Sequence, residues 1–130
     1  MSIPAELANA RYMSLETFKR SGDGVKTPVW FVESDGRLVV FSRPEAWKVK
    51  RIRRESGVRM APCDIRGNLL GQWHEGTGTL LTDAAPIKAA HRAMRRRYGW
   101  QMLAADVGAF VARRMADRAW IEIEVAPTPE

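Results

Sequence analysis

A hydroxyl residue followed by closely spaced cations is the feature of this sequence best suited to chemistry, because such a group would hold a phosphate. Ser42 ends a predicted strand, and the first two turns of the predicted helix that follows contain Lys48 and Arg51. These cations are three residues apart, so they share one helix face. Unpaired amides at a helix start also attract anions. The spacing alone leaves two interpretations equally open: a phosphate site, or an amphipathic helix with exposed basic residues.

Other segments that could belong to a functional site give weaker signals. Gly76-Thr77-Gly78 lacks the third glycine of a dinucleotide fingerprint and lies late in a predicted strand. Cys63 is expected to be a buried small hydrophobic residue. His74 either lines a site or is a satisfied structural histidine. One cysteine and two histidines are too few ligands for a Cys/His zinc site.

The composition indicates a basic globular chain. It has 130 residues, with 21 Lys and Arg against 15 Asp and Glu, and a formal net charge of +6. This length predicts a single domain spanning residues 1–130. The lone cysteine excludes an internal disulfide scaffold, and neither a membrane-spanning run nor a secretory signal is recognisable. We therefore expect a cytoplasmic protein whose basic charge suits nucleic acid, an anionic membrane surface or a multiply anionic small molecule.

Alternating apolar residues predict six strands, most of them joined as hairpins. The predicted strands span residues 11–18, 25–32, 37–42, 58–64, 69–82 and 119–125. Asp35-Gly36 is a strong hairpin-turn signal, and Pro28 places its strand at a sheet edge or a bulge. Glycines in the 69–82 strand predict close approach of another backbone or a ligand. The expected fold class is α+β: a small antiparallel barrel or open sheet with helices packed outside it.

Three helices are predicted between and after these strands. The first begins at Pro44 and runs to about Glu55, the second spans residues 85–98, and Gly99 separates the second from the third. In the third helix, apolar residues recur at helical spacing and form one face. That face consists of Trp100, Leu103, Ala104, Val107, Phe110 and Val111.

The order of several short segments resembles a known family. The segments are VKTPVWFVESDGRLVVFS, WKVKRIRRESGVRMAPCDIRGNLLG and WHEGTGTLL. Together they resemble the flavin and deazaflavin oxidoreductases named after pyridoxamine 5′-phosphate oxidase, and most closely the branch that uses coenzyme F420. The resemblance covers most of the chain. It implies a six-stranded antiparallel split β-barrel of the FMN-binding type, and a homodimer with cofactor sites between the protomers.

The resemblance also implies roles for individual residues. Lys48 matches the lysine that grips the cofactor phosphate, and Ser42 and Arg51 match neighbouring phosphate or tail contacts. The strand along the cofactor ring carries Thr27, Pro28 and Val29. Trp73 matches a strand that approaches the cofactor near the dimer interface. The chain lacks the later substrate-phosphate segment of true pyridoxamine 5′-phosphate oxidases, which argues against vitamin B6 oxidation.

The basic residues favour one cofactor over the other. F420 carries a phosphodiester and a polyglutamate tail, so the track of Lys48, Lys50, Arg51 and Arg54 suits it better than FMN, which needs one phosphate pocket. The predicted function is an F420-dependent oxidoreductase that transfers a hydride from the reduced deazaflavin to a small unsaturated or aromatic substrate. No catalytic side chain is predicted, because the chemistry belongs to the cofactor.

Three alternatives stay open at this point: an FMN-dependent oxidoreductase of the same fold, a cofactor carrier without turnover, and a nucleic-acid-binding module. The last is disfavoured because the aromatic residues are not interleaved with the basic runs as stacking platforms would be. The expected partners are therefore a small-molecule substrate and a second copy of the chain, with neither nucleic acid nor membrane.

Overall fold

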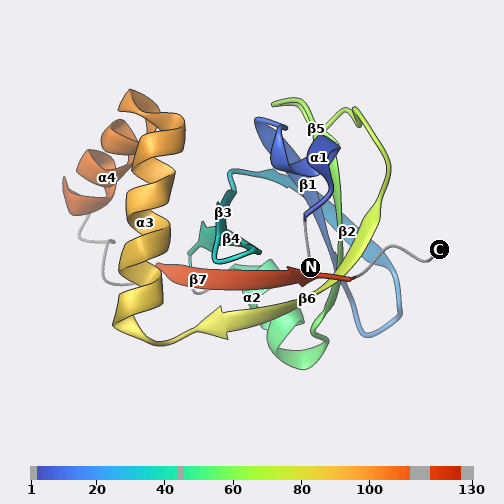
Figure 1. The fold of residues 1–130 in the computed structure, drawn as a ribbon. Coiled ribbons are helices and arrows are strands. Elements are labelled where there is room, and N and C mark those ends of the chain that lie inside the picture. The colour runs from blue at the N-terminus through green and yellow to red at the C-terminus, as the bar shows by residue number, and fades with distance from the viewer. Residues whose placement is uncertain (1–2, 44–45, 112–117, 127–130) are drawn as a thin grey trace.

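The computed structural model describes residues 3–43, 46–111 and 118–126 of the chain. In this part of the chain the seven strands are β1 (Tyr12–Phe18), β2 (Gly24–Val29), β3 (Val32–Ser34), β4 (Arg37–Ser42), β5 (Gly57–Cys63), β6 (His74–Leu81) and β7 (Ala119–Val125). They form one antiparallel sheet in the order β2-β1-β5-β6-β7-β4-β3. The sheet curls into a barrel whose edge strands are β2 and β3 (Figure 1).

Four helices accompany the sheet in the described residues. They are α1 (Ala5–Ala8), α2 (Trp47–Arg54), α3 (Ala84–Tyr98) and α4 (Trp100–Val111). In Figure 1, α3 and α4 lie together on one side of the sheet, and α2 lies near β6. The predicted α+β antiparallel class is confirmed, with α1 as an additional short helix. The predicted start of α2, at residues 44–45, lies outside the described residues. None of the described helices is long and apolar enough to cross a membrane.

The sheet has seven strands where the sequence pattern predicts six, because the strand expected at residues 25–32 is broken in two. β2 ends at Val29 and pairs with β1, whereas β3 begins at Val32 and pairs with β4. At the break, the Tyr98 hydroxyl accepts a hydrogen bond from the Phe31 N–H at 2.9 Å. It also lies 2.9 Å from the Arg11 carbonyl oxygen and 3.0 Å from that of Phe31. A side chain from α3 therefore replaces a neighbouring strand as the partner of this backbone.

Replacing Tyr98 by phenylalanine is expected to lower the free energy of unfolding by about 1–3 kcal/mol, because the buried Phe31 N–H loses its acceptor. Urea denaturation followed by circular dichroism measures the change. Tyr12→Phe is the matched control, since no hydrogen bond of the Tyr12 hydroxyl occurs within the described residues. Equal unfolding midpoints for the two variants would contradict the role given to Tyr98.

The second long strand is shorter than predicted. The pattern predicts residues 69–82, but β6 spans only His74–Leu81, and Leu69 makes an isolated bridge to Cys63. Between them the backbone turns to other partners: the Gln72 N–H donates to the Glu6 carboxylate at 3.2 Å. The close approach predicted for the glycines is confirmed at Gly76, where a Cβ would lie 2.7 Å from the Glu124 carbonyl oxygen.

Two local predictions about turns and edges are confirmed. Asp35 and Gly36 both have positive φ, 53° and 76°, as the tight turn between β3 and β4 requires. Pro28 lies in β2, an edge strand of the sheet, where a missing N–H donor is tolerated.

Two apolar clusters hold the molecule together. The first fills the barrel and includes Met13, Leu15, Met60, Ile121 and Ile123. The second lies between the helices and the outer side of β3, β4 and β7. It consists of Val32, Val39, Ala90, Met94, Tyr98, Met102 and Trp120. Because α3 contributes three of these side chains, it is the element that fixes the helical layer on the sheet.

The apolar face predicted for the third helix exists in α4, but it points outward. Its large side chains are mostly exposed: Trp100 by 76%, Leu103 by 56%, Val107 by 55% and Phe110 by 74%. Val111, also predicted for this face, has no described side chain. The opposite side of the helix carries the buried Met102 and Asp106. We call the exposed face, formed by Trp100, Leu103, Val107 and Phe110 with the exposed small residues Ala104 and Gly108, the outer face of α4.

Candidate functional site

A cavity of about 610 Å³ lies beside α2, and most of the residues that line it carry cationic side chains. Its lining residues are Lys19, Arg20, Trp47, Lys50, Arg51 and Arg54. Five of these six side chains are cationic and none is acidic, so the cavity presents a concentrated positive potential to an entering ligand. We call it the basic cavity.

Packing of α2 on the barrel brings the two halves of this cavity together. Val49 and Ile52 are buried at one side of the helix, which leaves the cationic side chains on the other. The Arg54 guanidinium donates a hydrogen bond of 2.6 Å to the carbonyl oxygen of Phe18, the last residue of β1. Lys19 and Arg20 follow Phe18 directly, so this contact places them opposite the helix.

The basic cavity also has a flat aromatic surface. Trp47 is 67% exposed, and the ammonium of Lys50 lies 4.6 Å from the centroid of its ring. An exposed tryptophan beside a cation offers a ligand both a stacking face and a charge. Lys50 and Arg51, both predicted site residues, are thus brought together in one cavity.

Lys48 has a different environment from the one expected for an exposed lysine. It is half-buried, and burial lowers the pKa of its ammonium group below the ordinary value. It shares α2 with Arg51 but is not among the residues that line the basic cavity. A half-buried ammonium gains more from an anionic partner than a fully hydrated one, because less water has to be displaced.

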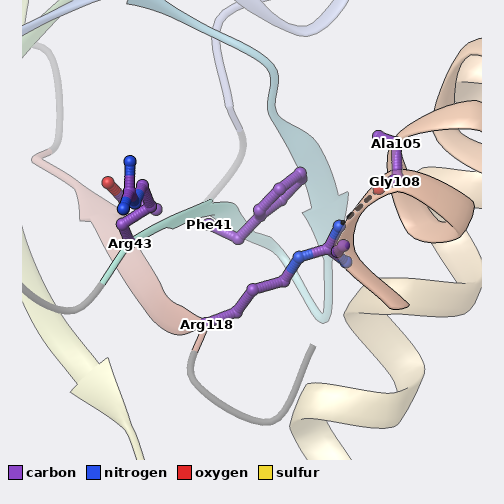
Figure 2. Close-up of a pocket in the computed structure, with 7 residues that line it drawn as sticks. Phe41, Arg43, Ala105, Gly108 and Arg118 are labelled. Carbon is purple, nitrogen blue, oxygen red and sulfur yellow. Dashed lines mark hydrogen bonds between the residues drawn. The ribbon is translucent and has the colours of Figure 1, made fainter. Parts of the chain in front are cut away.

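Ser42 borders a second, smaller cavity of about 390 Å³, at the end of β4. The cavity is lined by Phe41, Ser42, Arg43, Ala105, Gly108, Ala109 and Arg118 (Figure 2). We call it the Ser42 cavity. The guanidinium of Arg118 lies 4.6 Å from the Phe41 ring centroid and donates to the Ala105 carbonyl oxygen at 3.4 Å. Ser42 and Arg51, which the sequence places in one phosphate site, therefore border different cavities.

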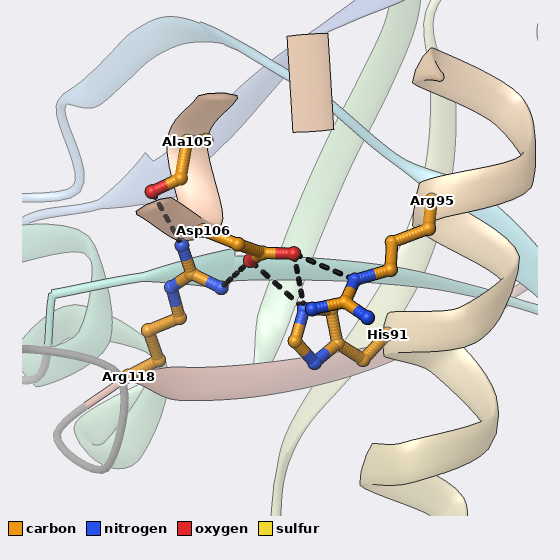
Figure 3. Close-up of polar contacts among 5 residues, drawn as sticks. All are labelled: His91, Arg95, Ala105, Asp106 and Arg118. Carbon is orange, nitrogen blue, oxygen red and sulfur yellow. Dashed lines mark hydrogen bonds and ion pairs between the residues drawn. The ribbon is translucent and has the colours of Figure 1, made fainter. Parts of the chain in front are cut away.

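A buried ion-pair network holds the wall of the Ser42 cavity in place (Figure 3). Asp106 of α4 is 3% exposed and accepts hydrogen bonds from three cationic or polar side chains. Arg118, just before β7, and Arg95 of α3 each donate at 2.7 Å, and His91 of α3 lies 2.9 Å away. The network ties two helices to the start of the last strand.

The charge state of Asp106 follows from these partners. Burial alone would raise the pKa of its carboxyl group, but hydrogen bonds from Arg118, Arg95 and His91 outweigh burial and hold the pKa below its ordinary value. Asp106 is therefore ionised at neutral pH. Its negative charge offsets the positive charge of Arg118 beside the cavity.

The three residues predicted to lie along a cofactor ring do not share one face of β2. Thr27 pairs with Leu15 and Val29 with Met13, and both partners belong to the barrel core. Thr27 and Val29 therefore point to the inner side of the sheet, and Val29 is 8% exposed. Pro28 points to the outer side and is exposed. A ring lying along β2 could meet side chains from only one of these two sides, and its contact with these residues stays a prediction.

Trp73 lies outside both cavities, over the outer side of β1, β2 and β5. Its ring is 5.2 Å from the Lys26 ammonium and 4.8 Å from the Arg59 guanidinium. Arg59 in turn forms a 3.0 Å ion pair with the buried Glu16. Trp73 therefore covers a salt bridge here, and its predicted role at a dimer interface stays a prediction.

The structure gives both Cys63 and His74 a structural role. Cys63 is 1% exposed, as predicted for a small buried residue, and burial raises the pKa of its thiol. His74 pairs with Glu6 of α1 at 2.8 Å, so it is a partnered histidine that anchors the N-terminal helix.

Sequence reasoning missed several residues of both cavities. Lys19, Arg20 and Trp47 could have been suspected from their charge or aromatic character, but only the contact between Arg54 and Phe18 places the first two beside α2. Arg118 and Asp106 are twelve residues apart in the sequence, and no local pattern indicates that they form an ion pair.

Comparison with known proteins identifies the family of this chain. The sequence profile described as pyridoxamine 5′-phosphate oxidase matches residues 2–128. The chain belongs to the pyridoxamine 5′-phosphate oxidase family. The family resemblance and the split-barrel fold predicted from the sequence are thereby confirmed. No curated protein matches the chain.

Solved structures of the same fold include proteins with different described roles. Rv2991 from Mycobacterium tuberculosis has a TM-score of 0.71 at 18% identity, covering 94% of this chain and 77% of its own. The heme storage protein HutZ from Vibrio cholerae has a TM-score of 0.70 at 9% identity, and the match covers 92% of this chain and 84% of HutZ. An F420 reductase has a TM-score of 0.60 at 18% identity, and the match covers 96% of this chain and 97% of the reductase. At these identities the likeness establishes the fold alone, so cofactor and activity have to be argued from this chain's own residues.

Proposed function

We propose that this chain is an F420-dependent oxidoreductase whose basic cavity holds the anionic tail of the cofactor. The observation that carries the proposal is the lining of that cavity: five cationic side chains, one exposed tryptophan and no carboxylate. Family membership supports a flavin-type cofactor, and an F420 reductase is among the proteins of the same fold.

The residues present fit the chemistry of F420 better than that of FMN. Both cofactors carry a phosphate, but F420 extends beyond it into a polyglutamate tail with several carboxylates. One or two cations would satisfy FMN, whereas the basic cavity of about 610 Å³ has cations on both of its walls. Such an arrangement is costly through self-repulsion unless a polyanion neutralises it.

Each group of residues has a distinct task in this proposal. Arg51, Lys50 and the residues facing them bind tail carboxylates, and the half-buried Lys48 binds the phosphate. The bound cofactor supplies hydride transfer to a small unsaturated or aromatic substrate. The protein contributes binding, orientation and exclusion of water, so no side chain of this chain is assigned as nucleophile or general base.

The proposal is tested by titrating the purified protein with F420 and with FMN and comparing the dissociation constants. We expect tighter binding of F420, and affinity that rises with tail length and falls with salt concentration, because the contacts are ionic. A single-stranded oligonucleotide of similar charge serves as the control for unspecific polyanion binding.

Equal affinity for F420 and FMN, or purification of a yellow protein already loaded with FMN, would refute the choice of F420 and favour the FMN-dependent alternative. Binding of the oligonucleotide as tightly as F420 would show that the basic cavity recognises charge alone. Tight binding of F420 without turnover of any tested unsaturated substrate would favour a cofactor carrier.

A further inference from the structure

The ring of Trp47 is a feature of the basic cavity that the cofactor tail does not use. A polyglutamate tail is a flexible chain of carboxylates, which cations alone can bind, and it has no flat group to lay on an aromatic side chain. Yet Trp47 lines the basic cavity and is 67% exposed. A large aromatic surface held open beside five cations indicates a second class of ligand, one that carries both a flat ring and several negative charges.

The position of Trp47 on α2 aligns its ring with the cations. Trp47, Lys50, Arg51 and Arg54 stand at positions i, i+3, i+4 and i+7 of the helix, so they share one face. The ammonium of Lys50 lies 4.6 Å from the ring centroid and covers part of the ring. Trp47 is mostly exposed nevertheless, so the ring still offers a stacking surface. A ligand stacked there would have its charged groups beside Arg51 and Arg54.

The opposite wall extends the positive charge beyond the helix. Lys19 and Arg20 line the same cavity, and the Arg54 guanidinium ties the two walls together by donating to the Phe18 carbonyl oxygen at 2.6 Å. Trp47 and Arg54 are the first and last residues of α2, which separates them by about 10 Å along the helix axis. The cations therefore continue from the ring over the length of a chain of phosphates, and a single phosphate would leave most of them unpaired.

These features distinguish a nucleoside triphosphate from other anions that carry a ring. FMN has one phosphate, so it would satisfy one or two of the five cations. A single-stranded nucleic acid is bound by successive stacking rings, whereas Trp47 is the one aromatic residue among the described residues that line the cavity. The cavity volume of about 610 Å³ suits one small molecule. One stacking ring with several cations fits the chemistry of a single nucleotide.

We propose that the basic cavity binds a purine nucleoside triphosphate, with its base stacked on Trp47 and its phosphates paired with Lys50, Arg51 and the cations facing them. A purine presents a larger flat surface to the indole ring than a pyrimidine does. The nucleotide and the cofactor tail need the same cations, so binding of one excludes the other. Only this competition rests on the proposed function, because nucleotide binding is argued from the cavity alone.

Magnesium is expected to weaken this binding. None of the described residues that line the cavity is acidic, so no carboxylate is there to hold Mg²⁺ against the phosphates. Mg²⁺ would instead neutralise part of the phosphate charge that the lysines and arginines bind. ATP should therefore bind more tightly in the absence of Mg²⁺, whereas sites that hold the metal between carboxylates and phosphates show the opposite dependence.

Calorimetric titration of the full-length protein with ATP and with inorganic triphosphate tests the proposal. We expect ATP to bind more tightly than triphosphate. Trp47→Leu should raise the dissociation constant for ATP by roughly 5–150 times, the effect of losing one stacked base, and leave that for triphosphate nearly unchanged. Trp47→Phe keeps a ring and should retain most of the affinity. Trp100→Leu is the matched control, because Trp100 is 76% exposed on the outer face of α4 and lines neither cavity.

Several outcomes would overturn the inference. ATP that does not bind, or binds no more tightly than triphosphate, would leave the ring without a role. An unchanged affinity for ATP in Trp47→Leu would do the same, and tighter binding with Mg²⁺ would contradict direct pairing of the phosphates. FMN that binds more tightly than ATP and depends on Trp47 would assign the ring to a flavin. An oligonucleotide that binds more tightly than ATP would assign the cavity to nucleic acid.

Competition between the two ligands is measured separately, by displacing F420 with ATP. We expect ATP to raise the apparent dissociation constant of long-tailed F420 and to leave that of a tail-free deazaflavin nearly unchanged. F420 binding that saturating ATP does not affect would overturn the shared site and leave the proposed function intact. A protein that binds ATP through Trp47 but has no affinity for F420 would refute the proposed function and leave the nucleotide site intact.

Discussion

Replacing Asp106 by asparagine is expected to lower the free energy of unfolding by about 3–5 kcal/mol, the effect of removing one partner from a buried ion pair. The side chain of Arg118 is only 9% exposed and would lose its charged partner. The half-exposed Arg95 can turn to solvent instead, so we expect a value near the lower end of that range. Urea denaturation at neutral pH measures the change, and Glu33→Gln, at an exposed carboxylate of β3, is the matched control.

The same variant gives a defined pH dependence. The pKa of Asp106 is lower in the folded protein than in the unfolded chain, where it is about 3.9. Its contribution to stability is therefore complete above that unfolded value and is lost as the pH falls through the folded pKa. The stability difference between the unaltered protein and Asp106→Asn should be constant near neutrality and shrink in acid. A difference that is absent at neutral pH, or that grows in acid, would contradict the network's role.

Replacing Arg51 by alanine is expected to weaken the binding of long-tailed F420 by about 1.5–3 kcal/mol, the range for a hydrogen bond to a charged group. That corresponds to a dissociation constant roughly 10–150 times higher. Binding of a tail-free deazaflavin should change little, because the basic cavity is assigned to the tail. Lys88→Ala is the control, since this exposed cation of α3 lines neither the basic cavity nor the Ser42 cavity.

Lys48→Ala in the same titration separates the tail from the phosphate. We expect it to weaken every cofactor form that carries the phosphate, whatever the tail length. If Arg51→Ala weakens tailed and tail-free cofactors equally, Arg51 does not bind the tail. If neither variant changes either affinity, α2 is an ordinary amphipathic helix with hydrated cations, the alternative that its sequence spacing leaves open.

Local patterns predicted those parts of the fold that depend on neighbouring residues. The turn at Asp35-Gly36, the edge position of Pro28 and the final strand at residues 119–125 all follow from alternation or backbone restrictions within a few residues. The break between β2 and β3 could not be predicted in this way. It depends on the Tyr98 hydroxyl, which comes from 67 residues further along the chain.

The candidate site was predictable to a similar degree and for the same reason. The cations of α2 stand out in the sequence, and Lys50 and Arg51 do line one cavity. The sequence did not indicate that Ser42 borders a different cavity from Lys50 and Arg51. That cavity is completed by residues of α4 and by Arg118, which are more than 60 positions away from Ser42 in the sequence. Periodicity also identified the apolar face of α4 but not its direction, which depends on the ion pairs that Asp106 makes with α3 and Arg118.

The place of β7 in the sheet has a consequence for how the molecule is made. Among the described strands β7 comes last in sequence order, yet it lies between β6 and β4 and is their only link within the described sheet. Until residues 119–125 leave the ribosome, a nascent chain can form β2-β1-β5-β6 and the β3–β4 hairpin only as two separate pieces. The unpaired edges of β4 and β6 would meanwhile be open to aggregation and to chaperones. Closure of the barrel thus has to wait until residues 119–125 are available, and it occurs by insertion of β7 between β4 and β6.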